Sequence, residues 1–149
     1  MVEKARAKAE AKYVEPEPVD EEGLPELPEG WAWATVEQLA ALMDRAIQSG
    51  PFGSALKHSE FTDEGILVVG IDNVQDGFFS MGRENRVSVA KFEELRRFEA
   101  RPGDVLITVM ATVGRCAVIP DDLETAIITK HVYRVSVEQR LMLLSLLMN

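Results

Sequence analysis

The sequence predicts an α+β domain built on a mixed, curved β-sheet with short helices. Short apolar runs bounded by Gly, Pro, Asn or Asp recur at 66–71, 105–110 and 116–119, as expected for short strands. Two segments, 35–43 and 91–98, show the apolar spacing of a helix. The chain has 149 residues, of which 46% are hydrophobic, so it can bury one core.

Each predicted helix follows a capping residue. Thr35 and Gln38 form a capping-box pattern, in which each side chain bonds a backbone N–H near the other residue. Ser88 can cap the helix at 91–98 by accepting a backbone N–H. The segment 126–135 predicts one or two further strands, in which Val and Tyr alternate with His and Arg.

We expect four regions along the chain. They are a helix end at 1–13, an extended linker at 14–30, a folded domain at 31–136, and the start of an apolar helix at 137–149. The linker is predicted because Pro16, Pro18, Pro25 and Pro28 lie in an acidic run, and prolines at this density exclude a helix. Leu27–Trp31 mark the entry to the domain, and we expect Trp31 and Trp33 to anchor the core or the linker.

The charge is unevenly distributed. The formal net charge is −9, which disfavours nucleic acid because phosphate contacts depend on Lys and Arg. Residues 1–30 hold nine acids and four bases, whereas 83–134 hold eight acids and nine bases. A DNA-binding function therefore requires the fold to gather bases on one face.

Catalytic chemistry has little support in the sequence. Cys116 is the single cysteine and lies in an apolar run, where a buried inert thiol is expected. His58 and His131 have no metal-ligand spacing, and no Gly-rich phosphate loop with lysine is present. Asp121 and Glu124 lie too far from Lys130 for a nuclease motif. We therefore expect no enzyme activity, no metal and no cofactor.

A membrane span is not expected either. The N-terminal residues are charged throughout, and the apolar run Leu141–Met148 is too short to cross a bilayer. A single cysteine fits a reducing compartment, so the cytoplasm is the expected location.

Several motifs, in order and spacing, resemble the target recognition domain of the specificity subunit of type I restriction-modification systems. They are Leu27–Trp31, Gly50–Ser54 with Lys57, Gly65–Val74 with Gly77, Leu95 with Arg101–Thr108, Thr112–Arg115, Ala117–Pro120 and His131–Arg134. The resemblance covers about residues 24–145. One departure is Ala111, where many members have glycine; a Cβ restricts φ there and disfavours close backbone approach to a phosphate.

The resemblance implies a sequence-specific DNA recognition module. In this family two such domains, each followed by a spacer helix that pairs as a coiled coil, recognise the two halves of a split target. The methyltransferase (M) and restriction/translocase (R) subunits perform the chemistry. The implied partners are double-stranded DNA, these subunits, and a second recognition domain in cis or in a dimer. The chain is expected to be the C-terminal half of a longer subunit or a single-domain version.

Basic and polar residues near predicted loops or strand ends are the candidate DNA contacts. They are Lys57, His58, Arg83, Asn85, Arg86, Lys130, His131 and Arg134. Arg and Asn can bond guanine and adenine edges bidentately. Arg134 alternates with Tyr133 and is expected to face DNA or a partner helix. A solvated loop at 57–58, or a local ion pair at 83–86, remains the alternative.

Another function also fits the composition. The net charge and the apolar segment after Val137 are compatible with a protein-interaction adaptor that does not bind DNA. Asn73 is expected to be a turn residue that bonds its own backbone.

Overall fold

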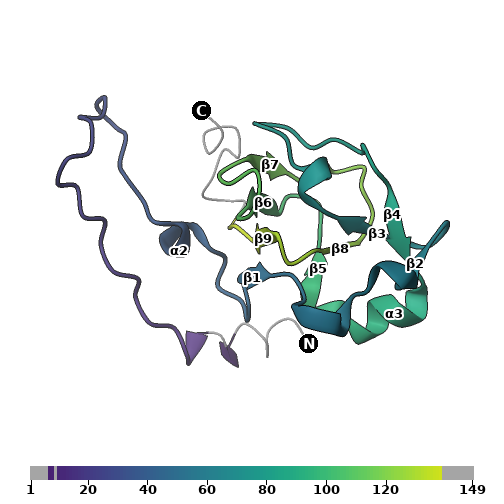
Figure 1. The fold of residues 1–149 in the computed structure, drawn as a ribbon. Helices are drawn as coiled ribbons and strands as arrows, with labels where there is room; N and C mark the ends of the chain where they lie inside the picture. Colours follow the sequence, from purple (N-terminus) through teal and green to yellow (C-terminus); the bar gives the residue numbers. More distant parts are fainter. Residues whose placement is uncertain (1–6, 9, 139–149) are drawn as a thin grey trace.

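The computed structural model describes residues 7–8 and 10–138 and contains two β-sheets with short helices packed around them (Figure 1). The four-stranded sheet is antiparallel and has the order β1 (Ile47–Ser49), β9 (Val132–Val135), β6 (Val105–Thr108) and β7 (Cys116–Val118). The five-stranded sheet has the order β2 (Phe61–Thr62), β4 (Asn85–Val87), β3 (Ile66–Val69), β8 (Ala126–Ile128) and β5 (Glu99–Ala100). In this sheet β3 and β8 are parallel, and the other pairs are antiparallel. The predicted α+β class with a mixed sheet is confirmed, although the strands divide between two sheets.

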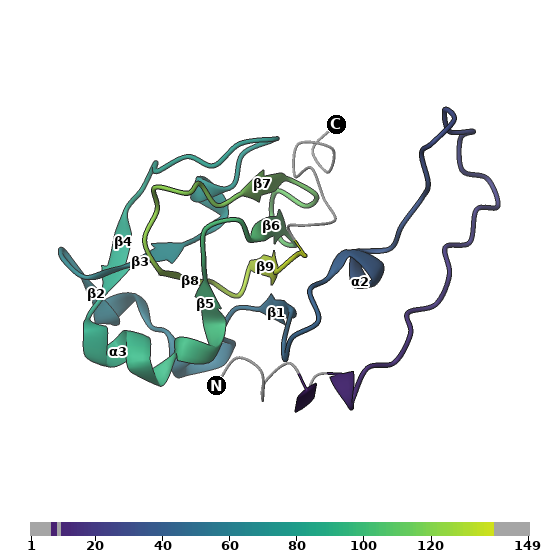
Figure 2. The same cartoon turned by 180° about the vertical axis from the view of Figure 1, so that it is seen from behind.

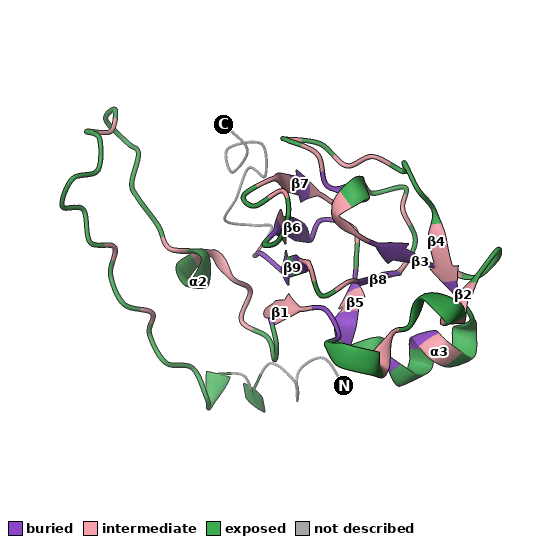
Figure 3. Cartoon of the chain, viewed as in Figure 1, coloured by how far each residue is buried: buried purple, intermediate pink, exposed green. Residues whose placement is uncertain are grey.

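The main hydrophobic core joins the two sheets. It includes Val69 and Ile128 from the five-stranded sheet and Leu106 and Ala117 from the four-stranded sheet. The strands contain most of the buried segments in Figure 3, whereas the long N-terminal segment is exposed. A smaller cluster around Val105, Val135 and Val137 involves the four-stranded sheet. A shared core of this kind holds the sheets at a fixed relative position.

Helix α2 (Val36–Leu39) has the predicted capping box. The Gln38 backbone N–H donates to the Thr35 hydroxyl at 3.2 Å, and the Thr35 backbone N–H donates to the Gln38 side-chain oxygen at 2.8 Å. The helix ends at Leu39 and not near Met43 as predicted. The reason is tertiary pairing, because Ala40 forms a β-bridge with Val137 and the Ala41 N–H donates to Ser136.

The same bridge corrects the expected start of the last helix, since Val137 is not helical. The rest of that predicted helix, from residue 139 onward, lies outside the described residues. Of the helix end predicted at 1–13, Ala7, Lys8 and Glu10 are helical, while residues up to 6 and residue 9 lie outside the described part.

Ser88 caps helix α3 (Val89–Glu94) as predicted, and its hydroxyl accepts the Lys91 N–H at 3.2 Å. The helix starts two residues earlier than expected and continues as a 3₁₀ turn, η4 (Arg96–Phe98). Three further 3₁₀ turns are η1 (Gly53–Ala55), η2 (His58–Glu60) and η3 (Ile71–Asn73). Turn η3 also ends the strand predicted at 66–71, so that β3 stops at Val69.

Residues 13–34, which we call the arm, form a long loop beside the sheets, without helix or strand (Figure 1). Trp31 is 57% exposed and Trp33 is 38% exposed, so neither belongs to the core. The Trp33 indole N–H donates to the Pro25 carbonyl at 3.2 Å, which ties two parts of the arm together. Trp33 is therefore an anchor of the linker.

Gly50 allows β1 to approach the connection between β8 and β9. A Cβ at this position would lie 2.2 Å from the Thr129 carbonyl carbon and oxygen. We predict that Gly50→Ala lowers the free energy of unfolding by about 3 kcal/mol, because the backbone must move to relieve the clash. Urea denaturation measures this loss.

Gly53→Ala is the matched control. Gly53 has a φ of +65° but open space around its Cβ position. Its substitution should cost about 1 kcal/mol from backbone strain alone. Equal losses for the two variants would contradict the close approach at Gly50.

Candidate functional site

The parallel pair β3 and β8 gives the five-stranded sheet two chemically different ends. Their carboxyl ends meet, with Val69 opposite Ile128 and the Thr129 N–H donating to the Val69 carbonyl at 2.9 Å. The antiparallel strand β4 begins at this same end, because Asn85 is opposite Val68. The segments 70–84 and 129–131 therefore lie together at one edge of the molecule.

The β6–β7 hairpin adds a third segment, 109–115, to this edge. The Val109 N–H donates to the His131 carbonyl at 3.0 Å, and the Gly77 N–H donates to the Cys116 carbonyl at 3.0 Å. We call segments 70–84, 109–115 and 129–131 the loop edge. The 74–84 segment runs beside β7 in both Figure 1 and Figure 2.

Ala111 has a φ of +62° in this hairpin. A left-handed conformation costs a residue with a Cβ about 1–2 kcal/mol relative to glycine. The buried Thr108 hydroxyl compensates locally, because it donates to the Thr112 carbonyl and accepts the Arg115 N–H at 3.1 Å. The hairpin therefore keeps a glycine-like backbone at Ala111.

Asn73 is the buried centre of the 70–84 segment and is only 1% exposed. Its side-chain oxygen accepts the Gly70 N–H at 2.9 Å. Its amide donates to the carbonyls of Ser80 and Met81, both at 3.0 Å. The predicted turn role is thus present and is extended to residues eight positions away.

Four of the predicted contact residues lie at or beside the loop edge. Arg83 and Lys130 are exposed, while Asn85 and His131 are half-buried. Arg83 and Lys130 form no ion pair with any residue in the described part of the chain. They are therefore free to bind an anion.

Lys57 and His58 lie elsewhere. They precede β2, whose first residue Phe61 is opposite Val87, at the amino end of β3. The His58 ring contacts the Phe61 ring, with centroids 5.1 Å apart. The structure therefore does not bring this pair together with Lys130 and His131.

Arg86 lies within β4 and is already engaged. Its guanidinium donates to the Gly65 carbonyl at 2.9 Å and pairs with Glu84 at 2.6 Å. This is the local ion pair that the sequence left open as an alternative. Any contact with DNA would have to compete with Glu84.

Arg134 is buried, so the expectation that it faces outward is wrong. Tyr133 is 37% exposed and Arg134 is 6% exposed. The Arg134 guanidinium donates to the Arg45 carbonyl and lies near the buried Asp104. Burial lowers the pKa of Arg134 and raises that of Asp104, and each charge partly offsets the shift of the other. Arg134 is a structural residue of the four-stranded sheet.

The charge of the loop edge is mixed. Arg115, which was not among the predicted contacts, adds a half-buried cation whose guanidinium is 3.4 Å from the Gln75 side-chain oxygen. Asp72 and Asp76 are exposed on the same edge. Many other bases are neutralised, because Lys91, Arg96 and Arg101 each pair with a glutamate. The required gathering of bases is therefore limited to a few cations and is not a broad basic face.

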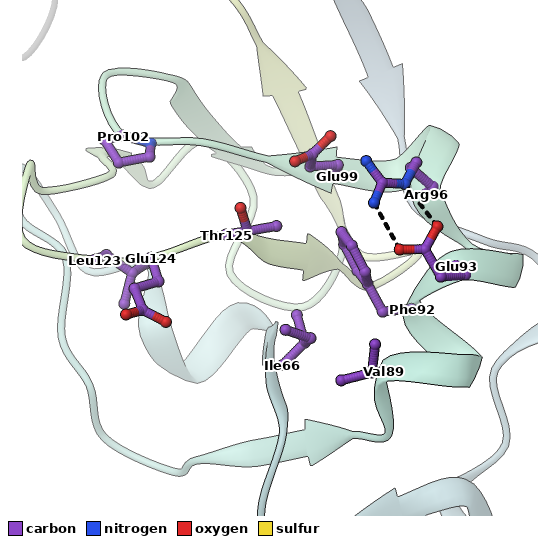
Figure 4. Close-up of a pocket in the computed structure, with 10 residues that line it drawn as sticks. All are labelled: Ile66, Val89, Phe92, Glu93, Arg96, Glu99, Pro102, Leu123, Glu124 and Thr125. Atoms are coloured by element: carbon purple, nitrogen blue, oxygen red, sulfur yellow. Dashed lines mark hydrogen bonds and ion pairs between the residues drawn. The ribbon is translucent and has the colours of Figure 1, made fainter.

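A groove of about 590 Å³ lies at the opposite, amino end of β3 and β8 (Figure 4). Ile66, Phe92 and Leu123 supply apolar lining. Its Glu93 carboxylate pairs with Arg96 at 2.6 Å, and this bond holds the pKa of Glu93 below its usual value. The groove contains no histidine, cysteine, serine or lysine. It therefore offers a surface for contact, with no histidine or lysine in its lining to activate a nucleophile.

Among the described residues, no three His, Cys, Asp or Glu side chains are grouped so that they could hold a metal ion. Burial raises the pKa of the Cys116 thiol, which favours the unreactive protonated form. No helix in the described part of the chain has the length and apolar character needed to span a membrane.

Asn73→Ala should loosen the 74–84 segment. The change removes the four hydrogen bonds of the Asn73 side chain and leaves partly buried backbone groups without these partners, so we predict a loss of about 2–3 kcal/mol in unfolding free energy. Amide exchange at Ser80, whose N–H bonds the Asn73 carbonyl at 2.8 Å, should become faster. Gln75→Ala removes an exposed bond to the Asp72 carbonyl and the long 3.4 Å contact with Arg115, and it should cost about 1 kcal/mol or less. Equal effects would show that Asn73 is not the anchor.

Comparison with known proteins relates this fold to one class of protein. No protein-family model matches the chain, and no curated protein matches it. Among solved structures, a chain from a study of complex assembly and conformational transition of the type I R-M system matches with a TM-score of 0.53 and 23% identity. It covers 98% of this chain and 35% of the solved chain. The HsdS subunit from Thermoanaerobacter tengcongensis matches with a TM-score of 0.50 and 21% identity, over 97% of this chain and 34% of its own length.

The chain thus spans about a third of the length of the solved chains that it matches. The resemblance expected from the ordered sequence motifs is confirmed at the level of the fold: the chain shares the fold of part of a chain from a type I R-M system and of part of the HsdS subunit from Thermoanaerobacter tengcongensis.

Proposed function

We propose that the chain is a sequence-specific DNA recognition module of a type I restriction-modification specificity subunit. In this role it recognises one half of a split target and directs the methyltransferase and restriction/translocase subunits to it. The observation that supports this most is the fold likeness to type I chains, which extends over 98% of the chain. The ordered motifs in the sequence support the same function.

The loop edge is the surface on which this function would depend. Cations such as Lys130 would contact phosphates and set the position of the duplex, while other side chains of the loops would contact base edges. Loops on a fixed scaffold suit such a role, because their side chains can change without damage to the core. The two sheets and their shared core provide that scaffold.

The module would itself be non-catalytic. The M and R subunits would supply the chemistry, and a second recognition domain, in cis or in a dimer, would recognise the other half of the target. A spacer helix after residue 137 would pair as a coiled coil. The complex would act in the cytoplasm, where its DNA substrate is found.

A protein-interaction adaptor is the second candidate. The exposed Trp31 and Trp33 on an acidic arm favour it, since aromatic side chains are frequent anchors of protein interfaces. The two functions predict different behaviour with duplex DNA, and one experiment therefore separates them.

The logarithm of the association constant for duplex DNA should fall linearly with the logarithm of the salt concentration. Fluorescence anisotropy can measure this dependence. Each phosphate contact contributes a slope of about −0.9. Lys130→Ala should weaken binding to all sequences and reduce the slope by about one. Arg96→Ala is the control, because Arg96 is paired with Glu93 at the other end of the sheet, and it should change neither quantity.

The adaptor function predicts a different result. In that case the chain binds no duplex at low salt, even when the cognate methyltransferase subunit is present. That outcome would overturn the DNA-recognition proposal.

A further inference from the structure

The 74–84 segment projects large side chains into solvent without using them to maintain its own shape. Phe78 is 61% exposed, Met81 is 39% exposed, and Arg83 is also exposed. Exposed aromatic and apolar side chains close together on a soluble domain often mark a binding surface. The segment also follows β3 directly, through η3, at the carboxyl end of the parallel pair.

The shape of this segment is fixed from within. The Asn73 side-chain oxygen accepts the Gly70 N–H, and its side-chain amide donates to the Ser80 and Met81 carbonyls. Val74 forms a β-bridge with Phe79, and the Gln75 N–H donates to the Phe78 carbonyl at 3.0 Å. The backbone is therefore ordered by buried and main-chain bonds, and Phe78, Met81 and Arg83 remain available for a ligand.

A second set of bonds fixes the segment to the other sheet. The Gly77 N–H donates to the Cys116 carbonyl of β7 at 3.0 Å. Arg115, the last residue of the connection between β6 and β7, contacts the Gln75 side chain at 3.4 Å. A loop that is held at both ends and in the middle loses little entropy when it binds, so its contacts contribute more fully to affinity.

The charged side chains on the segment indicate which part of a duplex it would contact, a base edge or a phosphate. Asp76 lies beside Phe78 on the segment and Asp72 just before it, and both are exposed. Carboxylates repel a phosphate but accept a hydrogen bond from the cytosine amino group. Arg83 can bond guanine bidentately, and apolar side chains can contact the thymine methyl group. This set of side chains suits the edges of base pairs in a groove better than the DNA backbone.

We propose that the 74–84 segment, positioned by Asn73, is the base-contacting element of the chain, with Arg83 and Phe78 as residues that determine specificity. This inference rests on the proposed DNA-recognition function. Lys130, on the connection between β8 and β9, would contact the phosphate backbone. Asn73 is a positioning residue and does not itself contact the DNA.

Selection of duplexes from a random-sequence pool tests this assignment with the full chain, alone and with the cognate methyltransferase subunit. The test variants are Phe78→Ala and Arg83→Ala. The controls are Val89→Ala and Arg97→Ala, an exposed apolar residue on α3 and an exposed cation on η4. All four side chains are exposed, so thermal denaturation should show an unchanged fold.

The wild type should enrich a defined sequence. Each test variant should lose preference at one or two base pairs and bind the wild-type sequence about 5- to 150-fold more weakly, the range for loss of one base contact. Phe78→Ala should leave the salt slope unchanged, because no phosphate contact is lost. The controls should enrich the wild-type sequence with wild-type affinity.

Two results would overturn the inference and leave DNA binding intact. In one, both test variants enrich the wild-type sequence with unchanged affinity. In the other, the wild type binds duplexes in a salt-dependent manner but enriches no sequence, and the sequence-specific function proposed above then fails as well. If the wild type binds no duplex under either condition, the proposed function itself fails, and the inference fails with it.

Discussion

The connection from β8 to β9, residues 129–131, is the constraint on which the arrangement of the molecule depends. β8 lies between β3 and β5 in one sheet, and β9 lies between β1 and β6 in the other. A connection of this length cannot let the sheets separate, so both sheets must share one core. Its backbone also bonds Val69 and Val109, and its carbonyl at Thr129 is the group that Gly50 approaches. Loops distant in sequence therefore meet at a single edge, because this short connection is bonded to Val69, which precedes the 70–84 segment, and to Val109 of the β6–β7 hairpin.

The two ends of the five-stranded sheet differ in how their charges are satisfied. At the amino end, α3 and its surroundings carry the ion pairs Glu60–Lys91 and Glu93–Arg96, so these cations are neutralised. At the loop edge, Lys130 and Arg83 have no such partner in the described part of the chain. A protein with a net charge of −9 and few free cations should bind DNA weakly without regard to sequence. Under the proposed function, its affinity would depend more on base contacts and on the partner subunits.

Features that depend only on neighbouring residues, such as helix caps, were predictable from the sequence. Contacts between segments that are distant in the sequence were not. The caps at Thr35 and Ser88 were predicted because a cap needs only neighbouring residues. Arg134 was misplaced because alternation indicates an exposed face only when one side of a strand is open, and three of the four residues of β9 are buried. Strands β1, β2 and β5 have two or three residues each, too few for a periodic signal. Asn73 was recognised as a turn residue, but its bonds to Ser80 and Met81 depend on the course of the following loop.

The arm shows why DNA recognition and protein contact need not compete within this chain. Trp31 and Trp33 are exposed on a segment rich in carboxylates, which would repel a duplex. The same carboxylates would favour a protein surface that carries bases around an apolar patch. The loop edge has the opposite combination, with free cations and side chains suited to base edges. A recognition module must hold DNA and its partner subunits at the same time, and two surfaces of different chemistry permit this. The features that favour an adaptor are therefore also what a DNA recognition module in a multi-subunit complex requires.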